Sequence, residues 1–326
     1  MRPAALLLAL GLLQAAPAAP PPGAAIPPAP DLAIGAGAIT ADLYKPDPVA
    51  GYYRGTRFDW SGSIARLTWN GHDYFGRWFE HYDPRSHDAI TGPVEEFSSV
   101  GYDDARAGES FVRIGVGAVR KPDEPAYRQF GQYDITDPGT WRVTKGPSQV
   151  EFVHTLPATR GYGYVYRKVV RLSGDTLVLE HHLKNTGTKA IATTVYEHNF
   201  YMLDRQPTGP DFVVRLPFAA AAARPLNGLA EMTGREVAFL KVFEPKQTIF
   251  TELTGFGTSP RDYDIRVENS KTGAGVRQTG DRPMSKLVLW SAATTVCPEA
   301  FIDLQAAPGA ETAWTITYQF YALPPR

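Results

Sequence analysis

The segment YGYVYRKVVRLSGDTLVLEHHLK, residues 162–184, decides the fold class of this chain. Two runs rich in β-branched and aromatic residues, Tyr162–Leu172 and Thr176–Lys184, flank the turn residues Ser173-Gly174-Asp175. Runs of this kind on either side of a short turn that contains glycine are typical of a β-hairpin. The segment therefore predicts two antiparallel strands.

Side chains on successive residues of a strand point to opposite faces of the sheet. In the first run this alternation places aromatic and cationic residues together. One face holds Tyr164, Tyr166, Lys168 and Val170, and the other holds Val165, Arg167, Val169 and Arg171. Because mixed aromatic and cationic faces suit a solvated or ligand-lined sheet better than a dry sandwich, we expect solvent or ligand on this strand.

Similar runs, separated by Gly, Pro, Asn and Asp, continue along the chain with hardly any helical period. They are Ser63–Trp69, Phe111–Val119, Gln149–Leu156, Ala190–Leu203, Phe212–Phe218, Glu236–Phe243, Thr248–Leu253, Tyr263–Glu268, Lys286–Ser291, Ala300–Gln305 and Thr312–Leu323. The pattern predicts an all-β fold. Since there is no internal repeat and no break in composition, we expect one domain over residues 39–326, a large antiparallel β-sandwich.

The N-terminus has the form of a secretory signal. The charged start Met1-Arg2 precedes the apolar run Ala4–Leu13 and the small residues Ala15–Ala19. That run is too short to span a bilayer. We predict a signal peptide over residues 1–19, a Pro/Ala-rich disordered lead-in over residues 20–38, and a periplasmic or secreted protein that is not held in a membrane after cleavage.

Composition excludes several classes of function. The net charge is -1 and no Lys/Arg run stands out, so neither nucleic acid nor an anionic membrane is an expected partner. The single cysteine, Cys297, rules out an intrachain disulfide. Gly115-Val116-Gly117 lacks the third glycine of a dinucleotide site, and HExxH, CxxC and GxSxG motifs are absent from the sequence. We predict no cofactor.

Two strand-like segments about a hundred residues apart each offer one proton-transfer group. TTVYEHNFY (residues 193–201) contains His198, and TVCPEAF (residues 295–301) contains Glu299. A histidine and a carboxylate that meet across a cleft are sufficient for concerted acid/base catalysis. Taken alone, each residue also fits a structural role: His198 as a core histidine, and Glu299 as a residue that blunts an edge strand.

The order of several motifs resembles the galactose mutarotase superfamily, which includes aldose 1-epimerases and hexose-6-phosphate epimerases. The similar segments are RFDWSGSIARLTWNGHDYFG (57–76), Asn185-Thr186-Gly187 followed by EHNFYML (197–203), and VCPE (296–299) followed by Pro308-Gly309 and WTITYQF (314–320). The resemblance implies a galactose mutarotase-like β-sandwich and an isomerase that interconverts sugar anomers without a cofactor. It also implies that His198 is the general acid and Glu299 the base.

The chain departs from this pattern where the family binds its substrate. The family's Asn-Arg and His-Gly-Gly substrate loops are not present, and GPVEEF (92–97) occupies that region. A later aspartate used by typical sugar mutarotases is also missing. The irregular segment Arg77–Ser110 is therefore expected to decide the substrate. A carbohydrate, either a free sugar or the end of a glycan, is the expected partner.

The candidate substrate-binding residues are polar groups for hydroxyls or carboxylates and rings for stacking on a sugar. They are Arg57, Arg77, Glu96, Arg113, Tyr201 and Trp290, with Phe200 as a further ring. Core packing and surface ion pairs are the alternatives for each. His181 and His182 are expected to point to opposite faces of their strand.

Three other readings stay open. His81, Asp83, His87 and Asp88 have the side chains of a metal site, although their spacing matches no closed zinc pattern. Glu95-Glu96 is half of a possible glycosidase carboxylate pair. The alternative functions are a non-catalytic carbohydrate-binding module on the same fold, or a polysaccharide lyase or hydrolase.

Overall fold

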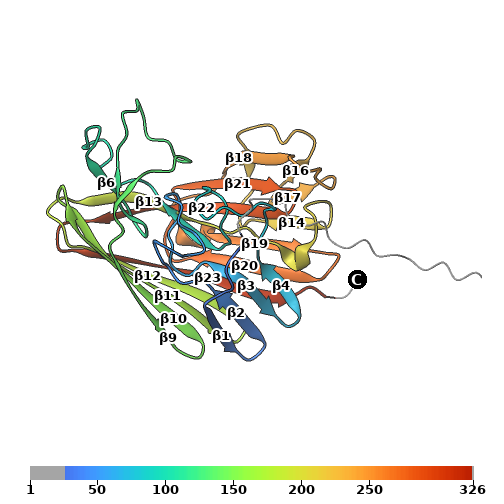
Figure 1. Ribbon diagram of the computed structural model, residues 1–326. Helices are drawn as coiled ribbons and strands as arrows, with labels where there is room; N and C mark the ends of the chain where they lie inside the picture. Colours follow the sequence, from blue (N-terminus) through green and yellow to red (C-terminus); the bar gives the residue numbers. More distant parts are fainter. Residues whose placement is uncertain (1–25, 325–326) are drawn as a thin grey trace, which may run out of the picture.

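The computed structural model describes residues 26–324 and shows an all-β protein (Figure 1). The helical elements in these residues are two 3-10 helices, η1 (Leu203–Arg205) and η2 (Pro260–Asp262). Neither is long and apolar enough to cross a membrane. The all-β prediction is confirmed.

Ten strands form the largest sheet, in the order β16-β17-β14-β19-β20-β23-β12-β11-β10-β9. All neighbouring pairs in it are antiparallel. The strands are β9 (Thr140–Lys145), β10 (Gln149–Thr159), β11 (Tyr162–Ser173), β12 (Thr176–Asn185), β14 (Phe212–Arg215), β16 (Ala230–Thr233), β17 (Glu236–Phe239), β19 (Asp264–Asn269), β20 (Ala274–Gly280) and β23 (Glu311–Ala322).

A six-stranded antiparallel sheet has the order β15-β18-β21-β22-β13-β5. Its strands are β5 (Val94–Phe97), β13 (Ile191–His198), β15 (Ala221–Ala222), β18 (Thr248–Thr254), β21 (Lys286–Ala292) and β22 (Thr295–Ala306). Two small sheets complete the fold. The first contains β1 (Leu32–Ala36), β2 (Ile39–Leu43), β3 (Ile64–Trp69) and β4 (His72–Phe75); the second contains β6 (Ser110–Arg113), β7 (Gly117–Arg120) and β8 (Ile135–Asp137).

The two large sheets pack face to face through buried side chains. Phe97 of β5 lies 5.5 Å from the ring of Tyr166 on β11 and 6.0 Å from the ring of Trp314 on β23, measured between centroids. All three rings are buried. The predicted sandwich of two large antiparallel sheets is therefore confirmed.

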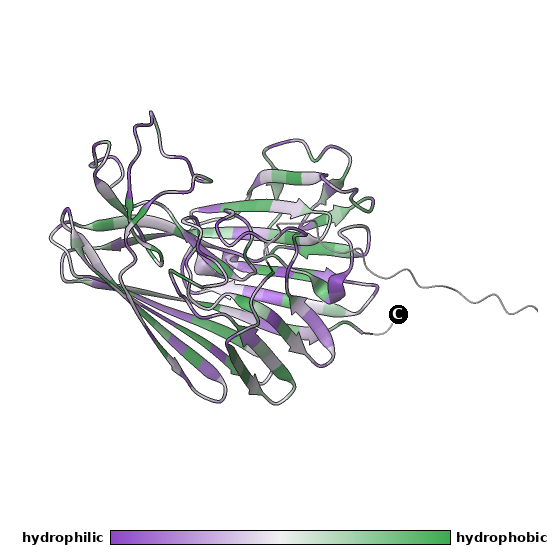
Figure 2. Cartoon of the chain, in the orientation of Figure 1, coloured by the Kyte–Doolittle hydropathy of each residue, from purple (hydrophilic) through white to green (hydrophobic). Residues whose placement is uncertain are grey.

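Apolar and polar residues alternate along the long strands β9 to β12 (Figure 2). On β11 the outcome differs from the expectation, because Tyr164, Tyr166, Lys168 and Val170 are all 0% exposed. Lys168 reaches a partner inside the core: its ammonium donates to the Glu95 carboxylate and to the Ser61 carbonyl. The expectation of solvent or ligand is therefore wrong for this face of β11, since an ion pair allows the cation to be buried. It holds for the other face, where Arg167 and Arg171 are partly exposed.

Two predicted strands are shorter than expected. Phe111–Val119 is divided into β6 and β7 by a turn at Gly115, whose φ of +79° is a conformation that glycine adopts readily. A Cβ atom there would lie 2.3 Å from Oδ1 of Asp59. Ala190–Leu203 ends as a strand at His198, and Phe200 beyond it has a φ of 47°.

Strand structure begins at Leu32 in the described residues, earlier than the sequence indicated. The predicted signal peptide, residues 1–19, lies outside the described residues. The lead-in predicted over residues 20–38 is wrong from Leu32 onward, because β1 (Leu32–Ala36) pairs with β2. Leu32 and Ile34 are buried in the main core. Their burial stabilises the strand despite its alanine- and glycine-rich composition.

Candidate functional site

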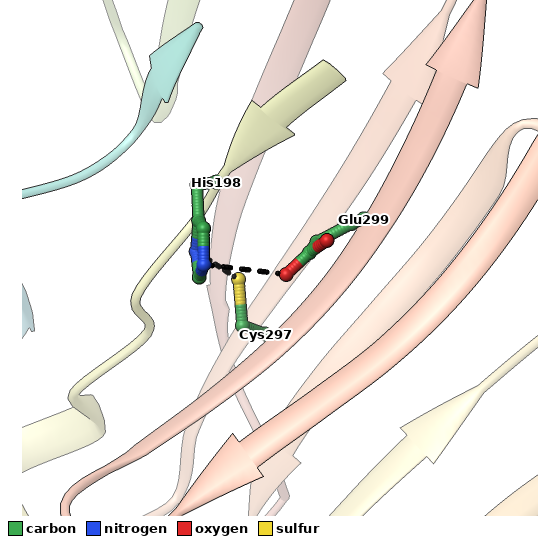
Figure 3. Close-up of side chains that lie close together, drawn as sticks. All are labelled: His198, Cys297 and Glu299. Carbon is green, nitrogen blue, oxygen red and sulfur yellow. Dashed lines mark hydrogen bonds and ion pairs between the residues drawn. The ribbon is translucent and has the colours of Figure 1, made fainter. Parts of the chain in front are cut away.

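The register between β13 and β22 brings His198 and Glu299 together. Val195 pairs with Ile302, and the isolated bridge between Tyr201 and Val296 continues the same register. His198 and Glu299 therefore occupy facing positions, where side chains share one face of the sheet. Nε2 of His198 lies 3.3 Å from Oε1 of Glu299 (Figure 3).

The expected meeting across a cleft is wrong in its geometry. His198 and Glu299 lie side by side on the six-stranded sheet and form part of one wall of a pocket. The sequence showed that each residue lies in or beside a strand. The pairing of the two strands with each other is a tertiary contact, which spacing along the chain does not reveal.

Cys297 contacts Nδ1 of His198, the ring nitrogen that lies away from Glu299. Its Sγ lies 2.8 Å from Nδ1 of His198 and accepts a hydrogen bond of 3.1 Å from the backbone N–H of Asn199. The sulfur connects Nδ1 to β22, so Nε2 is the nitrogen that faces Glu299 (Figure 3). Cys297 is fully buried, as expected for a small apolar residue, but its role in orienting the ring was not predicted.

Burial favours the neutral form of both groups in the pair. It lowers the pKa of His198 well below its ordinary value, and the nearby positive charge of Arg57 lowers it further. Burial also raises the pKa of Glu299 to about 8, although Arg57 opposes this shift. Near neutral pH the His198 imidazole is therefore neutral and the Glu299 carboxyl keeps its proton.

A buried ion pair lies next to the catalytic candidates. Nε of Arg57 lies 2.7 Å from Oε2 of Glu96, and its Nη2 donates to the Tyr196 hydroxyl at 3.1 Å. Gln129 donates to the other Glu96 oxygen at 2.8 Å. Tyr196 pairs with Glu96 across β13 and β5, so these groups adjoin His198 on the same sheet face.

The pocket over this sheet face has a volume of about 770 Å³. Aromatic rings form much of its inner end. The imidazole of His198 stacks on Phe200 with 3.8 Å between centroids, and Trp78 stacks on the same phenylalanine at 4.9 Å. Trp290 meets the imidazole edge-on at 5.3 Å. The site thus combines a buried histidine and carboxyl with apolar surface, and a few polar groups in an apolar lining are typical of small-molecule pockets.

Most of the predicted site residues line this pocket. Besides His198 and Glu299, these are Arg57, Glu96, Arg113, Phe200 and Trp290. Arg77 and Tyr201 do not line it. Arg77 is exposed outside the pocket, and Tyr201 is buried on the opposite face of its segment, where its hydroxyl is 3.1 Å from Oε1 of Gln278. Neither residue therefore belongs to the pocket that holds His198 and Glu299.

Several pocket residues were missed. They include Trp78, Gln129, Tyr196, Phe250, Lys286 and Phe301. Tyr196 shares a strand face with His198, so the period of two could have identified it. Phe301 stacks on Tyr196 at 4.1 Å, and Lys286 lies 3.8 Å above the Phe301 ring. Their presence in the site depends on strand order, which the sequence did not give.

A second cluster of ionisable groups lies on the opposite face of the same strands. Oε1 of Glu95 is 2.7 Å from Nε2 of His181, and Glu197 lies close to both. Burial alone would raise the pKa of Glu95, but the Lys168 ammonium, with His181, lowers it to about 2. Burial raises the pKa of Glu197 to about 8. This cluster joins the two sheets behind the pocket.

The positions of these side chains test two expectations from the sequence, the Glu95-Glu96 carboxylate pair and the opposite orientation of His181 and His182. Glu95 and Glu96 point to opposite sides of β5, so they do not form a carboxylate pair in one pocket. His181 is buried and His182 is partly exposed beside Glu311, which confirms the expected alternation of the two histidines.

Two groups of side chains among the described residues could hold a metal ion, and neither includes the residues of the loop 81–88, which the sequence left open as a metal site. They are His198, Cys297 and Glu299, and Glu95, His181 and Glu197. In the first group, the ligand atoms lie within 4.8 Å of one another, with the sulfur beside Nδ1 and the carboxyl beside Nε2 of the imidazole. In the second group, the Glu95 carboxylate already forms an ion pair with the Lys168 ammonium. Of the predicted loop, His87 and Asp88 lie on the pocket lining.

Comparison with known proteins shows the fold. No family model matches the chain, and no curated protein matches it. Solved structures do. A galactose mutarotase related enzyme from Lactobacillus acidophilus is 12% identical, with a TM-score of 0.56, over 91% of this chain and 99% of that one.

Two further structures agree with this result. A galactose mutarotase-like protein from Clostridium acetobutylicum is 13% identical over 89% of this chain and 95% of its own, with a TM-score of 0.56. An aldose epimerase homologue from Caenorhabditis elegans is 13% identical over 90% and 99%, with a TM-score of 0.52. The resemblance to the galactose mutarotase-like proteins is thus confirmed at the level of the fold.

Proposed function

We propose that this protein is an aldose 1-epimerase-like enzyme that interconverts the anomers of a reducing sugar. The observation that carries the proposal is the 3.3 Å approach of His198 Nε2 to Glu299 Oε1 in the pocket wall. The anomeric hydroxyl oxygen and the ring oxygen of a sugar are bonded to the same carbon. Two neighbouring proton-transfer groups can therefore reach both oxygens at once.

The reaction requires only proton transfers. His198 takes the proton of the anomeric hydroxyl while Glu299 delivers its proton to the ring oxygen, and the bond between C1 and the ring oxygen breaks. The open-chain aldehyde rotates about its C1–C2 bond. The reverse transfers close the ring with the other configuration at C1 and restore the neutral pair. Positioned proton transfer of this kind typically contributes ~10²–10⁴-fold.

The proposal exchanges the resting roles that the family resemblance implied. The resemblance gave His198 as the acid and Glu299 as the base. The directions of the two pKa shifts instead favour a resting state with the proton on Glu299 and none on Nε2 of His198. Each group donates one proton and accepts one proton per cycle. The assignment from the resemblance and the one proposed here therefore differ only in the protonation state of the pair before substrate binds.

The Arg57, Glu96 and Tyr196 network supplies further hydrogen-bonding groups beside the reacting centre. Arg57 holds Glu96, and Gln129 holds the other carboxylate oxygen, so these side chains are fixed before a sugar arrives. Preorganised polar groups bind hydroxyls with little loss of side-chain freedom. Under the proposal they hold the sugar with C1 over the catalytic pair.

The test is to measure anomer exchange by polarimetry or NMR across a panel of reducing sugars. We expect the native protein to accelerate exchange, and His198→Ala and Glu299→Gln to abolish most of the acceleration. Asp303→Asn is a matched control for Glu299→Gln. Asp303 is an exposed carboxylate on β22, the strand that carries Glu299, and it lies outside the pocket lining. Exchange at the uncatalysed rate with every sugar would overturn the proposal.

Non-catalytic carbohydrate binding is the second candidate. The observation that favours it is the low exposure of the pair, 4% for His198 and 5% for Glu299, which restricts their access to a ligand. Binding of a glycan without exchange, unchanged by either substitution, would identify this function.

We also propose that the protein acts outside the cytoplasm, on the basis of the signal-like residues 1–19. N-terminal sequencing of protein recovered from an extracytoplasmic fraction tests this. A mature chain beginning near residue 20 is expected, and a chain that keeps Met1 would contradict it.

A further inference from the structure

A row of side chains extends from the catalytic pair toward the open edge of the six-stranded sheet. Phe200 faces Cys297 in the register that continues beyond β13, Cys297 pairs with Trp290, and Trp290 pairs with Phe250. Directly paired residues lie on the same sheet face. Phe200, Trp290 and Phe250 accordingly all line the pocket.

The exposure of this row increases along its length. Phe200 and Cys297 are 0% exposed, Trp290 is partly buried, and Phe250 is 49% exposed. Burying a phenylalanine side chain is worth about 1.5–3 kcal/mol, so a half-exposed ring leaves part of that stabilisation unused. At the mouth of a pocket, such a ring is available to a ligand.

The surroundings of Phe250 suit a sugar ring. The guanidinium carbon of Arg224 lies 5.0 Å from the centroid of the Phe250 ring. Glu252, two residues further along β18, is exposed on the same strand face. An aromatic surface flanked by a cation and a carboxylate matches a pyranose, which has an apolar C–H face and hydroxyls around its edge.

The position of Phe250 is too far from the catalytic pair for one ring to reach both. Neighbouring strands are about 4.8 Å apart, and two such steps separate β22 from β18, which places Phe250 roughly 10 Å away across the sheet. The pocket of about 770 Å³ also lies in the upper part of the range of about 300–1,000 Å³ that holds drug-sized ligands. Both quantities fit two linked rings.

A second exposed ring, Phe130, also lines the pocket. Phe130 lies in a turn between strands, where the Arg57 guanidinium carbon is 4.7 Å and the His87 ring 4.9 Å from its centroid. Phe250 instead lies on β18 and continues the row of paired residues that starts beside the catalytic pair. This row gives a longer ligand a continuous aromatic path toward Phe250.

We propose that the substrate is the reducing end of an oligosaccharide, with its second pyranose ring on Trp290 and Phe250. This inference rests on the proposed function for the position of the first ring. The reacting C1 lies at His198 and Glu299, and the next ring extends over β21 and β18. Phe250 is then a specificity-determining residue that takes no part in proton transfer.

The experiment compares kcat/KM for anomer exchange of glucose and galactose with that of the reducing disaccharides maltose, cellobiose and lactose. We expect at least one disaccharide to be preferred over its hexose. Phe250→Ala should lower that preference about tenfold, as expected for loss of an aromatic contact. Phe250→Trp should retain it. Leu240→Ala is the matched control, because Leu240 is 47% exposed but outside the pocket lining.

The outcomes separate this inference from the proposed function. Acceleration of hexoses with no disaccharide preference, or a preference unchanged by Phe250→Ala, overturns the second-ring site and leaves the epimerase proposal intact. If no sugar is accelerated, the epimerase proposal fails, and disaccharide binding measured by NMR decides the second-ring site. Binding weakened by Phe250→Ala but not by Leu240→Ala supports it, and equal binding by all three proteins overturns it.

Discussion

His198 and Glu299 face each other across β13 and β22, with 3.3 Å between Nε2 and Oε1. Their separation is set by the register of two antiparallel strands and not by flexible loops. A site built on paired strands holds its geometry more closely than one on loops.

The two residues should act as one unit. We expect His198→Ala and Glu299→Gln each to lower kcat for anomer exchange by about 10²-fold or more, because each removes one of two coupled proton transfers. The double variant should be no slower than the slower single variant. Polarimetry on all three proteins checks this. Multiplicative losses would mean that the residues act independently.

Activity should decline at high pH. Under the proposed mechanism catalysis requires a neutral imidazole and a protonated carboxyl, and the raised pKa of Glu299 keeps the carboxyl protonated up to about pH 8. The lowered pKa of His198 prevents a second proton from binding until well below its ordinary range. We therefore expect kcat/KM, corrected for buffer catalysis, to be constant in weakly acidic solution and to fall above about pH 8. A profile that rises through pH 8 would contradict this assignment.

Glu299 should also affect how stability changes with pH. Between its ordinary pKa of 4.5 and the native value of about 8, the folded chain keeps a proton that the unfolded chain has lost. The stability due to this group is therefore complete below about pH 4.5 and falls as pH rises through about 8. Urea unfolding at pH 5 and pH 9 should show a smaller loss for Glu299→Gln than for the native protein. An identical loss in both would show that burial does not shift this carboxyl.

Cys297 is predicted to be a positioning residue. Without its sulfur, the Nδ1 side of His198 loses its contact with β22, and a misplaced group costs up to about 10²-fold in rate. Cys297→Ala should lower kcat with little change in KM, and Cys297→Ser should retain more activity because a hydroxyl can replace the contact. Steady-state kinetics of the two variants provide the comparison. Full kcat in Cys297→Ala would remove this role.

Lys168 should be important for stability. It is 0% exposed, and its ammonium pairs with Glu95, which is also 0% exposed. Removing one partner of a buried ion pair leaves a buried charge and costs about 3–5 kcal/mol. Lys168→Met should lower the urea midpoint by a corresponding amount, and adding Glu95→Gln should recover part of the loss. The exposed ion-pair variant Lys189→Met is the control. Equal midpoints for Lys168→Met and the native protein would contradict the prediction.

Local patterns were sufficient for much of the fold. The hairpin over residues 162–184 formed as predicted, as β11 and β12. The placement of Tyr196 and His198 on one face and Glu197 on the other also holds, because Glu197 accepts a hydrogen bond from Tyr263 on the core side. A period of two is a property of the strand itself, so it can be read from consecutive residues.

The errors concern features that depend on partners distant in sequence. Lys168 was assigned to a solvated face because its charge is visible in the sequence and Glu95 is not adjacent to it. Tyr201 was assigned to the pocket because of its ring, although its hydroxyl contacts Gln278 of β20, which is distant in sequence. Leu32–Ala36 was assigned to a disordered lead-in because its composition does not show that β2 lies beside it.

The sequence by itself determined the all-β class, most strands and the alternation of side chains along them, and it named His198 and Glu299 as candidates for proton transfer. The tertiary structure decided that His198 and Glu299 are neighbours, that Cys297 supports the imidazole, and that the row from Trp290 to Phe250 leads away from them. The physical reason is the range of the interactions. Alternation and turns are local, whereas strand order and register depend on which buried surfaces fit together across the whole chain.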